Sequence, residues 1–125
     1  MAMKEFIPDI QKLANKYNEP SLFINIVKAI KKGQAYPYYQ RGMLFILKPI
    51  IKDKQKTMFV WVGIHKVHNN LANDITHLEI MAKLTGFTHI RFESTRKGFK
   101  KYAPLFGYLC VGKRNQYDIY EKKVA

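Results

Sequence analysis

The chain has almost no capacity for covalent crosslinking. It contains one cysteine in 125 residues, so a disulfide cannot form within the chain. That residue, Cys110, lies in the apolar run YLCV, and burial among apolar groups raises the pKa of a thiol and lowers its reactivity. We therefore expect Cys110 to be a buried, unreactive packing residue.

Long apolar runs are also missing. The longest stretches, such as MLFILKPII, are interrupted by lysine or are too short to cross a bilayer. The N-terminal MAMKEFIPDI lacks the long apolar core and small-residue cleavage site of a secretory signal. The sequence therefore predicts an intracellular protein with no membrane partner.

Acidic residues are scarce. Nine Asp and Glu stand against 22 Lys and Arg, which leaves a net charge of +13. A field of this size attracts polyanions such as nucleic acid, an acidic protein surface or a phosphorylated cofactor. A soluble basic protein without such a partner would have the same composition, so charge alone does not choose among these alternatives.

The remaining composition is that of an ordinary folded protein. Hydrophobic residues make up 47% and charged residues 25% of the chain, values that exclude disorder and fibrous repeats. The length suits one domain over residues 1–125.

Hydrophobic spacing predicts an α+β fold that mixes helices and strands. Apolar residues at three- and four-residue steps predict helices over 6–18 and 21–32, with Ser21 as N-cap and Gly33 as the stop. The runs QAYPYYQRG, MLFILKPIIKD and KTMFVWVGIHKV predict an antiparallel meander, with the Pro37 strand at an edge. A helix ending at Gly86 then leads to the strand THIRFEST, which should lie parallel to the strand before that helix. A short helix broken by Pro104 and a C-terminal hairpin complete the chain.

The junction HKVHNNLAND, residues 65–74, contains no glycine. Its asparagines suit the N-cap of the following helix, and we favour that role over a modified phosphate-binding loop. His65 and His68, with Lys66, could hold an anion or move a proton near neutral pH. Two histidines at this spacing can also bind metal, but no further ligand set lies nearby, so no metal site is predicted.

The order of predicted elements, together with GIHKVHNNLAND and RKGFKKYAPLFGY, resembles the GNAT superfamily of N-acetyltransferases over nearly the whole chain. The second segment is similar to small GNAT-like proteins of bacteriophages. The resemblance implies a central mixed, mostly antiparallel sheet flanked by helices. If acetyl-CoA binds, it implies these cofactor-binding positions: Ile64, Lys66, His68, Asn69, Asn70, Ala72 and Asn73.

The loop departs from the family pattern R/Q-x-x-G-x-G/A. Asn69 stands at the first position, Ala72 at the first glycine, and Asp74 at the second small residue. A carboxylate at Asp74 would repel a diphosphate, and loss of glycine restricts the backbone. These departures from the family pattern predict that no cofactor is bound. If the protein is an active enzyme, acetyl-CoA binds through a divergent loop.

The family's acid and base positions are also altered. The general base aligns with Trp61, and the tyrosine acid aligns with Ala103. Tyr102 is adjacent, but one residue along a helix turns a side chain by about 100°. Tyr102 and His65 remain the candidate catalytic residues.

The densest basic and aromatic cluster follows the THIRFEST strand. Phosphate contacts from such a cluster give affinity without sequence readout, and its rings could stack on bases. The alternative is a solvated helix whose lysine stems cover its own rings. The cluster consists of Arg91, Arg96, Lys97, Lys100 and Lys101, with the rings of Phe99 and Tyr102 between them.

Two hypotheses follow. The first is a phage-encoded GNAT-like protein, degenerate for acetyl transfer, that binds nucleic acid, an acidic host protein or a virion component. It would be found in the host cytoplasm or in the virion. The second is an active acyl-CoA-dependent N-acetyltransferase with a divergent loop.

Overall fold

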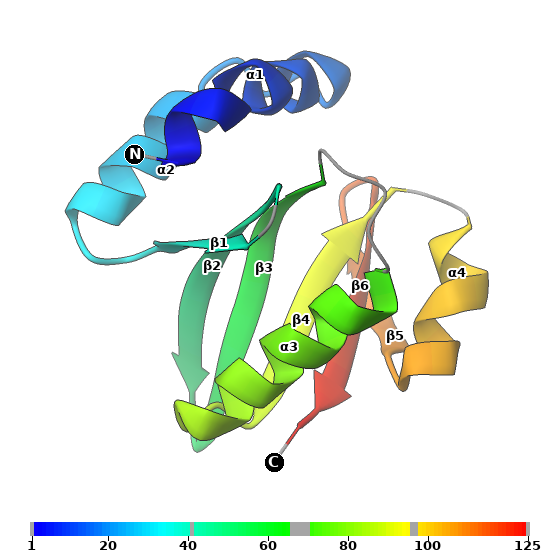
Figure 1. The fold of residues 1–125 in the computed structure, drawn as a ribbon. Helices are drawn as coiled ribbons and strands as arrows, with labels where there is room; N and C mark the ends of the chain where they lie inside the picture. The colour runs from blue at the N-terminus through cyan, green and yellow to red at the C-terminus, as the bar shows by residue number, and fades with distance from the viewer. Residues whose placement is uncertain (1, 41, 66–70, 96–97, 125) are drawn as a thin grey trace. The chain divides into compact units, whose positions relative to one another are not determined.

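A computed structural model of the chain describes residues 2–40, 42–65, 71–95 and 98–124 (Figure 1). The chain divides into two compact units. The first comprises Met1–Lys48 and Val62–His68, and the second comprises Pro49–Trp61 and Asn69–Ala125. The single domain expected over residues 1–125 stays a prediction.

Within the described residues, six strands form one sheet in the order β1-β2-β3-β4-β6-β5. β3 and β4 pair in parallel, whereas β1 with β2, β4 with β6, and β5 with β6 pair antiparallel. This confirms the predicted α+β class, the parallel crossover and the edge position of the strand that contains Pro37. The strands are β1 Tyr36–Gln40, β2 Met43–Lys52, β3 Gln55–His65, β4 His89–Ser94, β5 Leu109–Arg114 and β6 Tyr117–Lys123.

The first unit contains the two predicted N-terminal helices. A 3-10 turn, η1 (Ala2–Phe6), leads into α1 (Ile7–Lys16), and α2 spans Leu22–Lys31. Gly33 ends α2 with φ +70°, a conformation that costs glycine little because it has no Cβ. Ser21 holds the N-cap position, although its side chain makes no capping hydrogen bond. The apolar spacing buries one side of each helix: Ile10, Ala14, Leu22, Ile26 and Ala29.

The second unit is built around α3 (Leu71–Leu84) and the strand that follows it. Gly86 ends α3 with φ +88°, and the Phe87 N–H donates back to the Ala82 carbonyl at 2.9 Å. The Thr88 N–H then donates to the Lys56 carbonyl at 2.8 Å, which fixes the start of β4 beside β3. Among the described residues, no helix is long and apolar enough to span a membrane.

The segment after β4 is helical but short, as expected. α4 covers Phe99–Tyr102 and continues as the 3-10 turn η2, Ala103–Phe106. Pro104 lies at the start of η2, where its missing N–H costs no helical hydrogen bond. The Tyr108 N–H donates to the Ala103 carbonyl at 2.9 Å and leads the chain into β5.

At β4, β6 and β5, helices α3 and α4 pack on one face of the sheet. Side chains alternate between the faces of a strand, so Phe92 and Tyr120, which are register partners, share one face. α4 packs on this face through Phe99, whose ring lies 4.9 Å from that of Phe92. α3 reaches the same face, because its Glu79 pairs with Lys122. Figure 1 shows α3 running across β4.

The expectation that Cys110 is buried was wrong. Cys110 is exposed, and so is every residue of β5. The run YLCV is apolar, but most of it belongs to an edge strand that pairs with β6 alone. Tyr108, at the start of the run, is buried. Local composition therefore predicted the strand but not its position in the sheet.

Candidate functional site

The strand-to-helix junction at which the resemblance would place acetyl-CoA is present, since β3 ends at His65 and α3 begins at Leu71. Ile64 is buried on β3. The described residues do not include Lys66, His68, Asn69 and Asn70, nor the side chains of His65, Ala72 and Asn73. Their roles in capping, cofactor binding or proton transfer stay predictions.

Asp74 is the best-defined group of this junction. It lies in the first turn of α3 and is only 8% exposed. A carboxylate near a helix N-terminus compensates the partial positive charge of the unpaired N–H groups, a contribution of about 0.3–1 kcal/mol. A buried acid therefore already supplies negative charge at the helix end where a phosphate would be expected.

Ala103, which aligns with the family's acid, and its neighbour Tyr102 point in different directions. Ala103 is buried, whereas Tyr102 is 62% exposed. This agrees with the rotation of about 100° between consecutive helical residues. Trp61, at the aligned base position, is half-buried on β3. Among these positions, only Tyr102 offers a group that can transfer a proton, and it faces solvent.

The structure does not bring the predicted basic cluster together as one surface. Arg91 pairs in register with Glu121, while the neighbouring Phe92 pairs with Tyr120 on the opposite face. Phe99 packs on that second face, so Arg91 and Phe99 lie on different sides of the sheet. Lys100 and Lys101 are exposed, and Arg96 and Lys97 lie outside the described residues.

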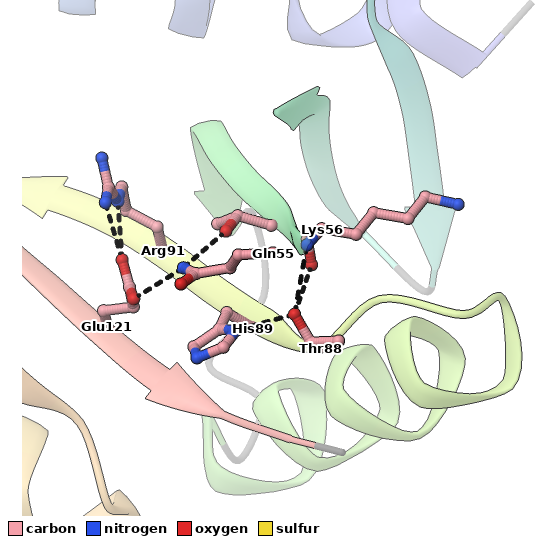
Figure 2. A network of polar contacts seen from close by, with 7 residues as sticks. Gln55, Lys56, Thr88, His89, Arg91 and Glu121 are labelled. Carbon is pink, nitrogen blue, oxygen red and sulfur yellow. Dashed lines mark hydrogen bonds and ion pairs between the residues drawn. The ribbon is translucent and has the colours of Figure 1, made fainter. Parts of the chain in front are cut away.

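The face that carries Arg91 holds a polar network (Figure 2). Glu121 Oε2 accepts from Arg91 Nε at 3.0 Å and from Arg91 Nη2 at 2.7 Å, and Glu121 Oε1 accepts from Gln55 Nε2 at 3.0 Å. Gln55 also donates to Thr57 Oγ1 at 3.1 Å. The charge of Arg91 is therefore already matched by an acid, which reduces its value for binding phosphate.

A second group in Figure 2 joins the starts of β3 and β4. Thr88 Oγ1 donates to the Lys56 carbonyl at 3.1 Å and accepts from the Lys56 N–H at 3.2 Å. The same hydroxyl lies 2.7 Å from His89 Nδ1. These bonds hold the strand ends in register, an ordinary structural role for His89.

The face under α3 and α4 holds a cluster of aromatic rings. Phe92 lies at its centre, with centroid distances of 4.9 Å to Phe99, 5.0 Å to Tyr108 and 5.4 Å to Tyr120. The Phe99 ring is thus engaged in packing instead of being free to stack on a base. Aromatic pairs of this kind add about 0.5–1.5 kcal/mol beyond area burial.

Two tyrosines of this cluster have buried hydroxyls. Tyr108 donates to Glu79 Oε2 at 2.9 Å, and the same oxygen lies 2.9 Å from Lys122 Nζ. Burial raises the pKa of the Tyr108 phenol, and the Glu79 charge raises it further. Burial and then the charge of Asp118 also raise the pKa of Tyr120. The Tyr120 hydroxyl has no hydrogen-bond partner among the described residues.

Asp118 links three elements of the second unit. Its carboxylate lies 3.9 Å from Lys100 Nζ of α4 and 3.9 Å from Lys113 Nζ of β5. Sequence reasoning missed Asp118 and Tyr120. The period-two pattern of YDIYEKK in β6 was the available signal, because it places Asp118, Tyr120 and Lys122 on one face.

Metal binding finds no support in the part of the chain that the structure describes. There, no group of three or more His, Cys, Asp or Glu residues could hold an ion. The histidine pair considered from the sequence cannot be assessed, because His68 and the side chain of His65 fall outside the described part.

Comparison with known proteins identifies the fold. Neither a protein-family model nor a curated protein matches the chain. Among solved structures, a GNAT-family acetyltransferase from Listeria monocytogenes aligns with a TM-score of 0.69 at 12% identity, over 98% of this chain and 87% of the other. A proposed acetyltransferase from Staphylococcus aureus aligns with a TM-score of 0.64 at 13% identity, over 100% and 95%. The chain has the GNAT fold, as its sequence predicted.

Proposed function

We propose that this GNAT-fold protein acts by binding an anionic macromolecule and does not transfer acetyl groups. The observation that supports the proposal most directly is Asp74, buried in the first turn of α3. In an acetyltransferase of this fold, the resemblance implies that amides at this helix end hold a diphosphate. An acid at this position does not suit such a group.

The size of the effect can be judged from Coulomb's law. Two like charges about 5 Å apart near a protein surface repel by about 3 kcal/mol, or more than a hundredfold in affinity. A helix dipole contributes about 1 kcal/mol or less in the opposite sense. At such a separation, repulsion by Asp74 would outweigh the attraction that the helix end offers.

The altered acid position supports the same conclusion. Ala103 cannot donate a proton, and the exposed Tyr102 faces solvent. Loss of a general acid or base lowers a rate by about 10² to 10⁴. A weak cofactor site without a positioned acid makes catalysis a poor explanation for this chain.

Binding is favoured by the charge of the chain. The net charge of +13 attracts polyanions, and the described lysines of α4 and β5, Lys100, Lys101 and Lys113, are exposed. The proposed partner classes are nucleic acid, an acidic host protein and a virion component. A bacteriophage origin fits these classes and remains part of the proposal.

Calorimetric titration with acetyl-CoA tests the proposal. The unaltered protein should give no heat of binding at about 1 mM ligand, whereas Asp74→Asn, which removes the charge at nearly constant volume, should bind detectably. Micromolar binding by the unaltered protein would contradict the proposal. The tryptophan spectrum and melting temperature of both proteins serve as controls for folding.

Titration with polyanions tests the second part of the proposal, that the protein binds an anionic macromolecule. The protein should bind polyglutamate, duplex DNA or both at low salt, with an affinity that falls steeply as salt increases. Lys100→Glu with Lys101→Glu should weaken binding more than Lys54→Glu, a charge reversal in the exposed turn between β2 and β3. If neither polyanion bound at low salt, the proposal of anion binding would be overturned.

The second candidate function is acyl-CoA-dependent N-acetyltransfer. It is favoured by the alignment of two structures named as acetyltransferases over 98% and 100% of this chain. In that case the junction residues from Ile64 to Asn73 would hold the cofactor, and Tyr102 or His65 would handle protons. Consumption of acetyl-CoA with a panel of amines would separate this function from the first.

A further inference from the structure

β5 and the turn before it form an unusual surface in the second unit. Leu105, Leu109 and Val111 are 77%, 66% and 56% exposed. Leu109 and Val111 belong to one strand whose residues are all exposed, and contiguous exposed apolar surface is typical of interaction sites. Lys113 belongs to the same strand, with its side chain 72% exposed. We call these four residues the β5 surface.

The backbone of β5 offers a second attractive feature. β5 is the last strand of the sheet and pairs with β6 on one side. An edge strand presents a row of N–H and C=O groups that can pair with another extended segment. β1, at the other end of the strand order, carries Pro37, which has no N–H to donate. β5 contains no proline.

The positive charges on β5 disfavour some partners at this edge. Lys113 and Arg114 lie on the edge strand of a chain with net charge +13. Lysine at a sheet edge disfavours pairing with a second identical edge, so a second copy of this chain is a poor occupant. Arg114 already pairs with Glu93 at 2.6 Å. Lys113 lies 3.9 Å from Asp118 and its side chain is 72% exposed, so Lys113 is the charge of this strand that can attract an acidic segment.

Nucleic acid also fits this surface poorly. Base stacking needs free aromatic faces. The Phe99 ring packs against Phe92 and Tyr120, and the exposed Tyr102 belongs to α4 and not to the β5 surface. Leu105, Leu109 and Val111 cannot stack in this way, and phosphates gain nothing from them. Leu109 on one face of β5 and Lys113 on the other instead match a peptide in which apolar and acidic residues alternate.

We propose that the β5 surface binds an extended peptide segment of a partner protein, in which acidic and apolar residues alternate and which adds as a strand beside β5. This proposal rests on the proposed function, since it names the partner class for anion binding. It goes beyond that function by committing to a protein partner and to backbone pairing.

The register of β5 specifies how the segment would lie. Val111 is bulged between Cys110 and Gly112, so Leu109 and Arg114 share one face while Cys110 and Lys113 share the other. Asp118 holds Lys113 and Lys100 near one another, 3.9 Å from each. Acidic side chains of the segment would therefore meet Lys113 and Lys100 on the α4 side, and apolar ones would meet Leu109.

A synthetic peptide of about eight alternating glutamates and valines, a common strand length, tests the proposal by fluorescence anisotropy. It should bind about tenfold more tightly than polyglutamate of the same length, because apolar contacts add to charge. Two analogues, N-methylated on one or the other backbone edge, probe strand addition. One analogue should lose binding and the other should keep it.

Variants locate the site. Leu109→Ser and Lys113→Glu should each lower the affinity for the peptide by about three- to tenfold, since each removes a contact worth about 1 kcal/mol. Both side chains are exposed, so the variants should fold. Lys54→Glu, with the same charge change away from β5, is the matched control and should have less than about a twofold effect.

The outcomes separate this proposal from the one on which it rests. Equal binding of polyglutamate and the alternating peptide, or binding of both N-methylated analogues, would overturn strand addition while anion binding stands. Tight binding of duplex DNA through Lys113, without peptide binding, would replace the protein partner by nucleic acid. Dimerisation lost in Leu109→Ser would show that a second copy occupies the edge. Failure of every anionic probe would overturn both proposals.

Discussion

Arg91 and Phe92 are neighbours on β4, yet their side chains belong to two different environments. Phe92 faces α3 and α4 and contacts three aromatic rings. Arg91 faces the other side and binds Glu121. The ring contacts of the first face are insensitive to salt, although that face also carries the Glu79–Lys122 pair. The second face is held by the Arg91–Glu121 pair, which salt screens. Stability should therefore depend on the aromatic face far more than on the charged one.

The largest effect should come from Phe92→Ala. It removes the partly buried ring at the centre of the cluster, together with its contacts to Phe99, Tyr108 and Tyr120. The free energy of unfolding should fall by about 3 kcal/mol. Urea denaturation followed by circular dichroism measures this, and a loss below 1 kcal/mol would mean that the cluster packs loosely.

Alkaline pH should weaken the same face. The Tyr108 pKa is raised in the folded protein by burial and by Glu79, so above about pH 10 the unfolded chain releases a proton that the folded protein keeps. The stabilisation is complete below that pH and is lost as pH rises, by about 1.4 kcal/mol per pH unit.

Tyr108→Phe is the comparison for this pH effect. It loses the bond to Glu79 and should be less stable near neutral pH, but its stability should decline less steeply above pH 10, because there is no phenol to titrate. Parallel slopes for the two proteins in denaturation at several alkaline pH values would argue against the assignment.

Arg91→Ala tests how much the charged face contributes to stability. The Arg91 side chain is partly exposed and its pair with Glu121 is accessible to salt, so the loss should be about 1 kcal/mol or less. The difference from the unaltered protein should shrink at about 1 M salt. A loss equal to that of Phe92→Ala would remove the distinction between the two faces.

The smallest effect should come from Tyr120→Phe. The buried Tyr120 hydroxyl has no hydrogen-bond partner among the described residues, so its removal takes away a desolvated polar group and little else. Stability should stay within about 0.5 kcal/mol or rise slightly. A loss above 1 kcal/mol would indicate that the hydroxyl has a partner, such as a bound water.

The candidate site was only partly accessible from sequence. The hydrophobic spacing located the strand-to-helix junction. Comparison of its loop with the family's glycine positions drew attention to Asp74. Sequence reasoning also grouped Arg91 with Phe99 and Lys100, because they lie close in the chain. That grouping ignored the alternation of side chains on β4, which separates Arg91 from Phe92 and from the α4 residues packed on it.

The sequence by itself determined the helices, the strands and their ends, because each depends on local spacing and on residues such as Gly33, Pro37 and Gly86. Only the tertiary structure decided that β6 lies between β4 and β5. That order exposes Cys110 on an edge strand and brings Asp118 near Lys100. Strand order depends on contacts between distant segments, whose energies are not contained in the period of any single run.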